Sequence, residues 1–109
     1  MTAADALRDR RAAALALLAT LERDFAAVVT ASGDSNADDE HDPEGATIAF
    51  ERAQLDSSIA DLRAQLAQLD AALERVAAGT YGICEVCGLP IPAARLEARP
   101  AARTHVACA

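Results

Sequence analysis

Residues 81–88 read Tyr-Gly-Ile-Cys-Glu-Val-Cys-Gly, and residues 105–108 read His-Val-Ala-Cys. These two stretches hold all 3 cysteines of the 109-residue chain, in the pattern C-x2-C…H-x2-C. Two close pairs of soft or borderline ligands are typical of a closed tetrahedral zinc site. We therefore predict a small C-terminal zinc finger over residues 79–109. It should bind one structural Zn²⁺ per chain through Cys84, Cys87, His105 and Cys108.

Other interpretations of the cysteines explain less. A redox-active C-x-x-C pair belongs in an α/β surround like that of thioredoxin, and the chain shows no such pattern. A chance cluster of three small, buried cysteines would not account for the paired spacing. Gly88 directly follows the second cysteine, where it lets the backbone take the left-handed conformation that a metal-binding turn uses.

The composition favours helices and argues against nucleic-acid binding. Aromatic residues make up 3% of the chain, too few for a thick globular core, whereas alanine and leucine dominate. The net charge of −7 has the wrong sign for a protein that neutralises DNA phosphates. The sequence shows neither a signal pattern nor an apolar run long enough to span a membrane. Since metal-bound cysteines suit a reducing compartment, we expect a cytoplasmic protein without membrane contact.

Two long segments before the finger carry apolar residues with the alternating spacing of four and three that is typical of a coiled-coil seam. The first has Leu7, Ala14, Leu18, Leu21, Phe25 and Val28, and the second has Ile48, Leu55, Ile59, Leu62, Leu66, Leu69, Leu73 and Val76. Between them lies a polar, acidic segment rich in turn-forming residues. We predict an all-α fold: a long antiparallel two-helix coiled-coil hairpin over residues 1–78, with an acidic tip loop at 32–46, followed by the Cys3His finger.

Antiparallel pairing makes the register specific. Leu7 should approach Leu69, and Phe25 should lie near Arg52. Arg52 and Arg11 occupy seam positions, so their stems should cover apolar surface while their guanidinium groups reach acidic side chains at the edge.

The end of the second helix should lead directly into the finger. Leu73 and Val76 extend past the first helix and should pack on the finger, and Gly79 should end the second helix. Within the finger, we expect the small core to consist of Ile91, Leu96 and Val106.

The finger sequence resembles one known family. Tyr81-Gly82, Cys84-x2-Cys87-Gly88, Ile91 and Arg95-Leu96-Glu97-Ala98-Arg99-Pro100 are similar to the motif of the DksA/TraR zinc-finger family, and a long hairpin precedes the finger in that family too. His105 stands where the family's third cysteine usually lies. The resemblance implies a transcription regulator that binds RNA polymerase through its secondary channel and modulates initiation without contacting DNA.

The resemblance also implies functional residues at the hairpin tip. The family's Asp-x2-Asp-x-Ala tip aligns with His41, Glu44 and Ala46, and Asp42 is one residue from the first acidic position. We therefore expect Asp42, Glu44 and Ala46 to act on the polymerase active centre. The alternative is a solvated loop that the repulsion between its carboxylates keeps extended.

Two arginines of the finger are candidate contacts to polymerase or to a nucleotide, namely Arg95 and Arg99. The alternative is that they pair with Glu85 or Glu97 and stabilise the finger. Gln68 and Ala109 stand where the family's nucleotide site has lysines, so we expect guanosine tetraphosphate to bind weakly or not at all.

The pattern leaves two classes of function open. The first is the polymerase-binding regulator, which we expect to act as a monomer without direct nucleic-acid contact. The second is a zinc-stabilised helical-hairpin interaction module with no polymerase role. The chain has no nucleophile set or phosphate loop, and its histidine at position 105 is used for zinc, so we do not expect an enzyme.

Overall fold

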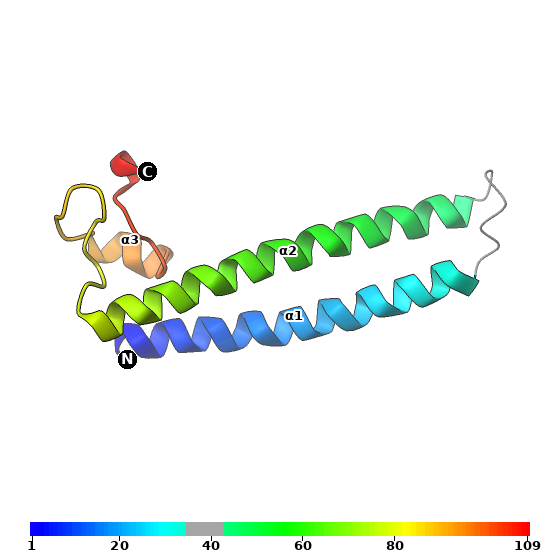
Figure 1. Cartoon of the computed structure of the whole chain (residues 1–109), viewed down its shortest axis with the longest axis horizontal. Helices are drawn as coiled ribbons and strands as arrows, with labels where there is room; N and C mark the ends of the chain where they lie inside the picture. Colours follow the sequence, from blue (N-terminus) through cyan, green and yellow to red (C-terminus); the bar gives the residue numbers. More distant parts are fainter. Residues whose placement is uncertain (35–42) are drawn as a thin grey trace. The chain divides into compact units, whose positions relative to one another are not determined.

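The computed structural model describes residues 1–34 and 43–109, and in these ranges all regular structure is helical (Figure 1). The elements are α1 (Ala3–Asp34), α2 (Pro43–Ala78), α3 (Ala93–Ala98) and the 3-10 turn η1 (Val106–Cys108). The extended backbone of this part of the chain forms one isolated antiparallel bridge, between Ile83 and Pro90. The predicted fold class, an all-α hairpin followed by a Cys/His finger, is confirmed.

Both long helices extend further than the predicted tip loop at 32–46 allowed. α1 continues to Asp34 and α2 begins at Pro43, so residues 32–34 and 43–46 are helical. The glycines at 33 and 45 argued for a loop, but one glycine costs a helix only about 1 kcal/mol. Proline is well tolerated in a first helical turn, where its missing N–H would have no partner within the helix.

The start of α1 and the end of α2 both have specific caps. At the start of α1, the Thr2 hydroxyl accepts a hydrogen bond from the Asp5 N–H, and the Asp5 carboxylate accepts one from the Thr2 N–H, both at 3.1 Å. This is a reciprocal capping box. At the end of α2, Gly79 has a φ of 77°, and the Thr80 N–H donates to the Arg75 carbonyl at 2.9 Å. The predicted stop at Gly79 is therefore a left-handed cap that turns the chain into the finger.

By its internal contacts the chain forms two compact units. The hairpin unit is Leu15–Ala64, and the finger unit combines Met1–Ala14 with Gln65–Ala109. The contacts therefore group the start of α1 and the end of α2 with the finger, whereas the sequence suggested a division at residue 78.

In the hairpin unit the seam follows the predicted period. The described side chains that are not exposed between 15 and 64 include Leu18, Leu21, Phe25, Val28, Ile48, Leu55, Ile59 and Leu62. The guanidinium of Arg52 lies over the Phe25 ring at 5.8 Å, which confirms that pairing. An ion pair between Arg63 and Glu22, at 3.1 Å, also joins the two helices.

In the finger unit α1, α2 and the finger share one core. Leu7, Leu69 and Ala72 form its centre, with Leu73, Val76, Tyr81 and Ala101 packed around it. The predicted contact of Leu7 with Leu69 is confirmed, and Leu73 and Val76 pack against the same cluster as the finger residues Tyr81 and Ala101. Arg11 also behaves as predicted, because its Nε lies 2.6 Å from the Asp70 carboxylate.

Across residues 1–34 and 43–109, no helix has both the length and the apolar character that crossing a membrane requires.

Candidate metal centre

The four predicted zinc ligands meet at one point. One donor atom from each of Cys84, Cys87, His105 and Cys108 lies within 4.8 Å of the other three. Bonds of about 2.3 Å to sulfur and 2.0 Å to nitrogen, at tetrahedral angles, would separate such donors by roughly 3.5–3.8 Å. The His105 Nδ1 atom lies 3.3 Å from the Cys87 sulfur and 4.0 Å from the Cys108 sulfur. The donor set and its spacing thus fit a four-coordinate zinc ion, and the finger is a structural zinc site.

The backbone around the first cysteine pair is a tight knuckle. The Cys84 N–H donates to the Leu89 carbonyl and the Gly88 N–H donates to the Cys84 carbonyl, both at 2.9 Å. Gly88 has a φ of 74°, which a residue with a side chain adopts only at a cost. This confirms the predicted role of the glycine: it closes the turn that directs both sulfurs to the same side.

The structure also shows which nitrogen of His105 faces the metal position. The other ring nitrogen, Nε2, lies 2.9 Å from the Pro90 carbonyl oxygen. A carbonyl oxygen can only accept, so Nε2 carries the proton and the Nδ1 lone pair is left for a metal. A hydrogen bond of this kind orients a histidine ligand and makes it more basic.

The thiols influence one another's protonation. Burial raises the pKa of Cys84, but hydrogen bonds from the backbone N–H groups of Cys87, His105 and Val86 outweigh it and lower this pKa to about 5. Burial and the hydrogen bonds to Cys84 and Cys87 raise the pKa of Cys108 to about 11. Three thiolates cannot gather here unless a cation compensates their charge, and a zinc ion supplies that charge when it is bound.

The two candidate arginines have different surroundings. The Nε atom of Arg95 donates to the Thr104 carbonyl at 2.7 Å, so Arg95 braces the segment that leads to His105. Glu85, one of the two carboxylates considered as its partner, instead pairs with Arg103 at 2.9 Å, an ion pair that was not predicted from the sequence. A hydrogen bond from Arg103 holds the pKa of Glu85 below its usual value.

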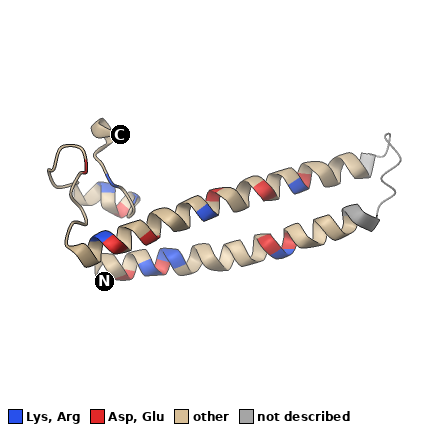
Figure 2. Cartoon of the chain, viewed as in Figure 1, with Lys and Arg blue, Asp and Glu red and all other residues tan. Residues whose placement is uncertain are grey.

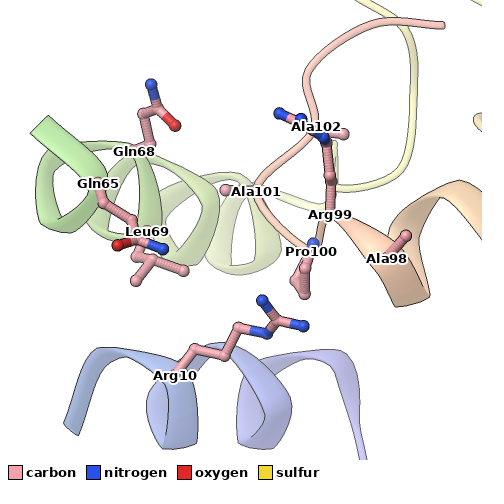
Figure 3. A pocket seen from close by; sticks show the side chains of 9 residues that line it. All are labelled: Arg10, Gln65, Gln68, Leu69, Ala98, Arg99, Pro100, Ala101 and Ala102. Atoms are coloured by element: carbon pink, nitrogen blue, oxygen red, sulfur yellow. The ribbon is translucent and has the colours of Figure 1, made fainter. Parts of the chain in front are cut away.

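Arg99 lies in a pocket of about 340 Å³ whose walls come from α1, α2 and the chain that follows α3 (Figure 3). Arg10 enters this pocket from α1, and Gln65 and Gln68 enter from α2. In Figure 3 the two guanidinium groups lie apart. Arg10 was not predicted as a site residue, because nothing in the sequence shows that the start of α1 lies beside residue 99.

The predicted finger core needs one correction. Ile91 is 5% exposed, as expected, and Leu96 is half-buried. Val106 is 73% exposed and does not belong to the core. It lies in η1, where the short turn that positions Cys108 directs the valine outward.

Only part of the predicted tip can be located. Asp42 lies outside the described residues, as does His41. Glu44 falls in the first turn of α2, and Ala46 is exposed on the same helix.

These observations define a class: a protein whose structural zinc finger is joined to a two-helix hairpin. Residues 79–109 match the family described as "Prokaryotic dksA/traR C4-type zinc finger". This segment therefore matches the DksA/TraR type of finger, with His105 at one position of the four-cysteine set.

Several known proteins are similar to this chain over part of their sequence. The chain is 52% identical over 44 residues to "RNA polymerase-binding transcription factor DksA" of Caulobacter vibrioides, a match that covers 40% of this chain and 31% of the relative. It is 40% identical over 72 residues to "Uncharacterized protein YteA" of Bacillus subtilis, which covers 66% of this chain and 30% of the relative. It is 38% identical over 73 residues to "General stress protein 16O" of the same organism, which covers 66% of this chain and 44% of the relative.

The fold comparison covers more of the chain. The structure of transcription factor DksA2 from Pseudomonas aeruginosa matches 96% of this chain and 75% of its own, with a TM-score of 0.80 and 24% sequence identity. This likeness supports the fold. The curated relatives are matched over less than half of their own length.

Proposed function

We propose that this protein binds RNA polymerase through its secondary channel and modulates transcription initiation without contacting DNA. The observation that carries the proposal is the combination of a DksA/TraR finger at 79–109 with the hairpin fold of DksA2. A relative that shares the finger sequence is named as an RNA polymerase-binding transcription factor. The net charge of −7 agrees with a partner other than DNA.

In this proposal Cys84, Cys87, His105 and Cys108 hold a single Zn²⁺, which orders the finger. Four protein donors complete a tetrahedral shell, so no coordination position remains for water or substrate. The proposal therefore includes no catalysis by the metal. Its role is to fix the finger against the core that contains Leu7 and Leu69.

The effect on transcription is assigned to the tip residues Asp42, Glu44 and Ala46. A carboxylate influences chemistry only where charge matters, and the magnesium-bound centre of a polymerase is such a place. Ala46 is a small exposed residue that lets the helix approach a partner surface closely. Helix α2 carries both Glu44 and Ala46, so any partner that holds α2 also positions these two residues.

The finger unit offers a separate cationic contact. Arg99 and Arg10 line one pocket, and no ion pair of either is found among the described residues. We propose that they contact acidic groups on polymerase. Arg95 contributes to this contact only indirectly, because its hydrogen bond to the Thr104 carbonyl braces the segment that leads to His105. Gln68 in the same pocket is neutral, whereas the family's nucleotide site has a lysine at this position. Guanosine tetraphosphate would therefore meet one cation fewer here, in line with weak nucleotide binding.

The decisive test has two stages. First, the purified zinc-loaded protein is assayed for binding to core RNA polymerase by pulldown and by a fluorescence titration. Second, in vitro transcription compares the wild type with Asp42→Asn/Glu44→Gln, which removes two charges and keeps shape. The control is Asp56→Asn/Asp61→Asn, two exposed carboxylates of α2 away from the tip.

We expect the tip variant to bind polymerase within a few-fold of the wild type and to lose most of its regulatory effect, while the control retains it. A wild type that does not bind polymerase would contradict the proposed function and favour an interaction module with another partner. A tip variant that regulates normally would show that the hairpin acts by occupying the channel.

A further inference from the structure

Phe50 lies on the outside of helix α2, where a coiled coil normally has polar residues. The seam of α2 runs through Ile48, Arg52 and Leu55, so position 50 falls on the outer face of the heptad. The side chain is 64% exposed. The chain has only 3 aromatic residues, and the other two, Phe25 and Tyr81, pack against neighbours. Hairpin folding therefore does not explain this phenylalanine.

Phe50 lines an open groove of about 650 Å³ in the hairpin unit. One wall comes from α1, with Asp24, Ala27 and Val28, and the other from α2, with Phe50, Glu51, Gln54 and Leu55. Val28 and Leu55 belong to the seam, so the floor of the groove is apolar. The groove thus combines an exposed aromatic ring with an aliphatic floor, the composition of an interface centre.

The charges that line the groove have one sign. Asp24 and Glu51 are its charged residues, and neither has an ion-pair partner in the part of the chain that the structure describes. Elsewhere on the two helices acidic and basic residues are interspersed, as Figure 2 shows, and Glu22 is paired with Arg63 at 3.1 Å. Two unpaired carboxylates beside an aromatic ring complement a segment that has both basic and apolar side chains.

We propose that this groove is a specific docking site for a basic, partly apolar segment of RNA polymerase. An apolar side chain of that segment packs on Phe50 and the aliphatic floor, and arginine or lysine residues next to it pair with Asp24 and Glu51. The inference rests on the proposed function and adds to it a fixed point of attachment in the hairpin unit. This point does not involve the tip carboxylates or the zinc finger.

The experiment measures binding of the full-length, zinc-loaded protein to purified core polymerase at several salt concentrations. Phe50→Ser tests the aromatic contact, and Leu17→Ser is its control, since Leu17 is 50% exposed and does not line the groove. The charge test is Asp24→Asn/Glu51→Gln, with Asp56→Asn/Asp61→Asn as control. Circular dichroism checks helicity, which neither surface change should alter.

We expect Phe50→Ser to weaken binding at least about tenfold, as for an interface hot spot, and Leu17→Ser to weaken it less than about twofold. The Asp24/Glu51 variant should bind more weakly at low salt and show a smaller dependence on salt than its control. These results together would support the groove.

Three outcomes would overturn the inference, each in a distinguishable way. If the wild type does not bind polymerase, the proposed function fails and the docking site fails with it. If the wild type binds and Phe50→Ser behaves like Leu17→Ser, the groove is not the contact, although the proposed function stands. If sedimentation shows that the wild type self-associates and Phe50→Ser is monomeric, the occupant is a second copy of this chain.

Discussion

Leu69 provides the sharpest test of the packing within the finger unit. It is 2% exposed, and it lies in one cluster with Leu7, from α1, and Ala72, from α2. Replacing Leu69 with alanine removes three carbon atoms from this cluster. At about 0.8 kcal/mol per buried CH₂, the lost transfer free energy is about 2.4 kcal/mol. The cavity left behind raises the expected loss of unfolding free energy to roughly 3–4 kcal/mol.

The loss translates into a large shift of the melting temperature. An unfolding entropy of about 2.1 cal/mol/K per residue gives roughly 0.23 kcal/mol/K for a chain of this size, so Leu69→Ala should lower Tm by about 15 °C. The assay is thermal and urea unfolding followed by circular dichroism at the helical band, with zinc in excess. Leu17→Ala is the matched control, because Leu17 is 50% exposed and should cost less than about 0.5 kcal/mol.

A double-mutant cycle makes the test specific to the contact. Leu7→Ala and Leu69→Ala should together cost less than the sum of the two single changes, because each cavity relaxes the packing around the other residue. The described core would be refuted by a Leu69→Ala cost below about 1 kcal/mol. It would also be refuted if the two costs simply added, since additivity indicates residues that do not touch.

Three smaller predictions concern the finger. Cys84→Ser should abolish binding of one zinc per chain, measured by metal analysis, and expose the finger amides to hydrogen exchange while most helicity remains. Tyr81→Phe should cost about 1–2 kcal/mol in urea unfolding, because the buried Pro100 carbonyl loses a hydrogen bond that the tyrosine hydroxyl donates at 2.7 Å. Hydrogen bonding to Arg103 lowers the pKa of Glu85, so this pair should stabilise the finger fully above the usual glutamate pKa and lose its effect as pH falls through the lowered one. Glu85→Gln should therefore flatten the acid limb of stability against pH, and an unchanged limb would contradict the pairing.

The hairpin could be predicted because its signal is local and repeated. Each seam residue lies three or four positions from the next, and a helix turns this spacing directly into one buried stripe. Two helices with matching stripes then have a limited choice of register. For this reason the contacts of Leu7 with Leu69 and of Phe25 with Arg52 follow from the sequence.

The finger was less predictable because its side-chain directions depend on turns. Val106 was expected inside and is exposed, since η1 orients three consecutive residues differently from a longer helix. Glu85 or Glu97 was one alternative for the partner of Arg95, but Arg95 donates to the Thr104 carbonyl and Glu85 pairs with Arg103. Irregular backbone offers many carbonyl acceptors, and the sequence does not indicate which of them will point toward a given guanidinium.

His105 shows how the spacing in the sequence and the geometry of the folded finger combine. The spacing identified it as the fourth donor, but the sequence could not tell which ring nitrogen would face the thiols. The knuckle that places Cys84 and Cys87 on one side also brings the Pro90 carbonyl to 2.9 Å from Nε2, and this leaves Nδ1 for the metal. A cysteine at this position could supply a donor atom but could not donate that second hydrogen bond. Histidine therefore ties the second ligand pair to the turn that carries the first, so that it links the two halves of the finger even before the metal does.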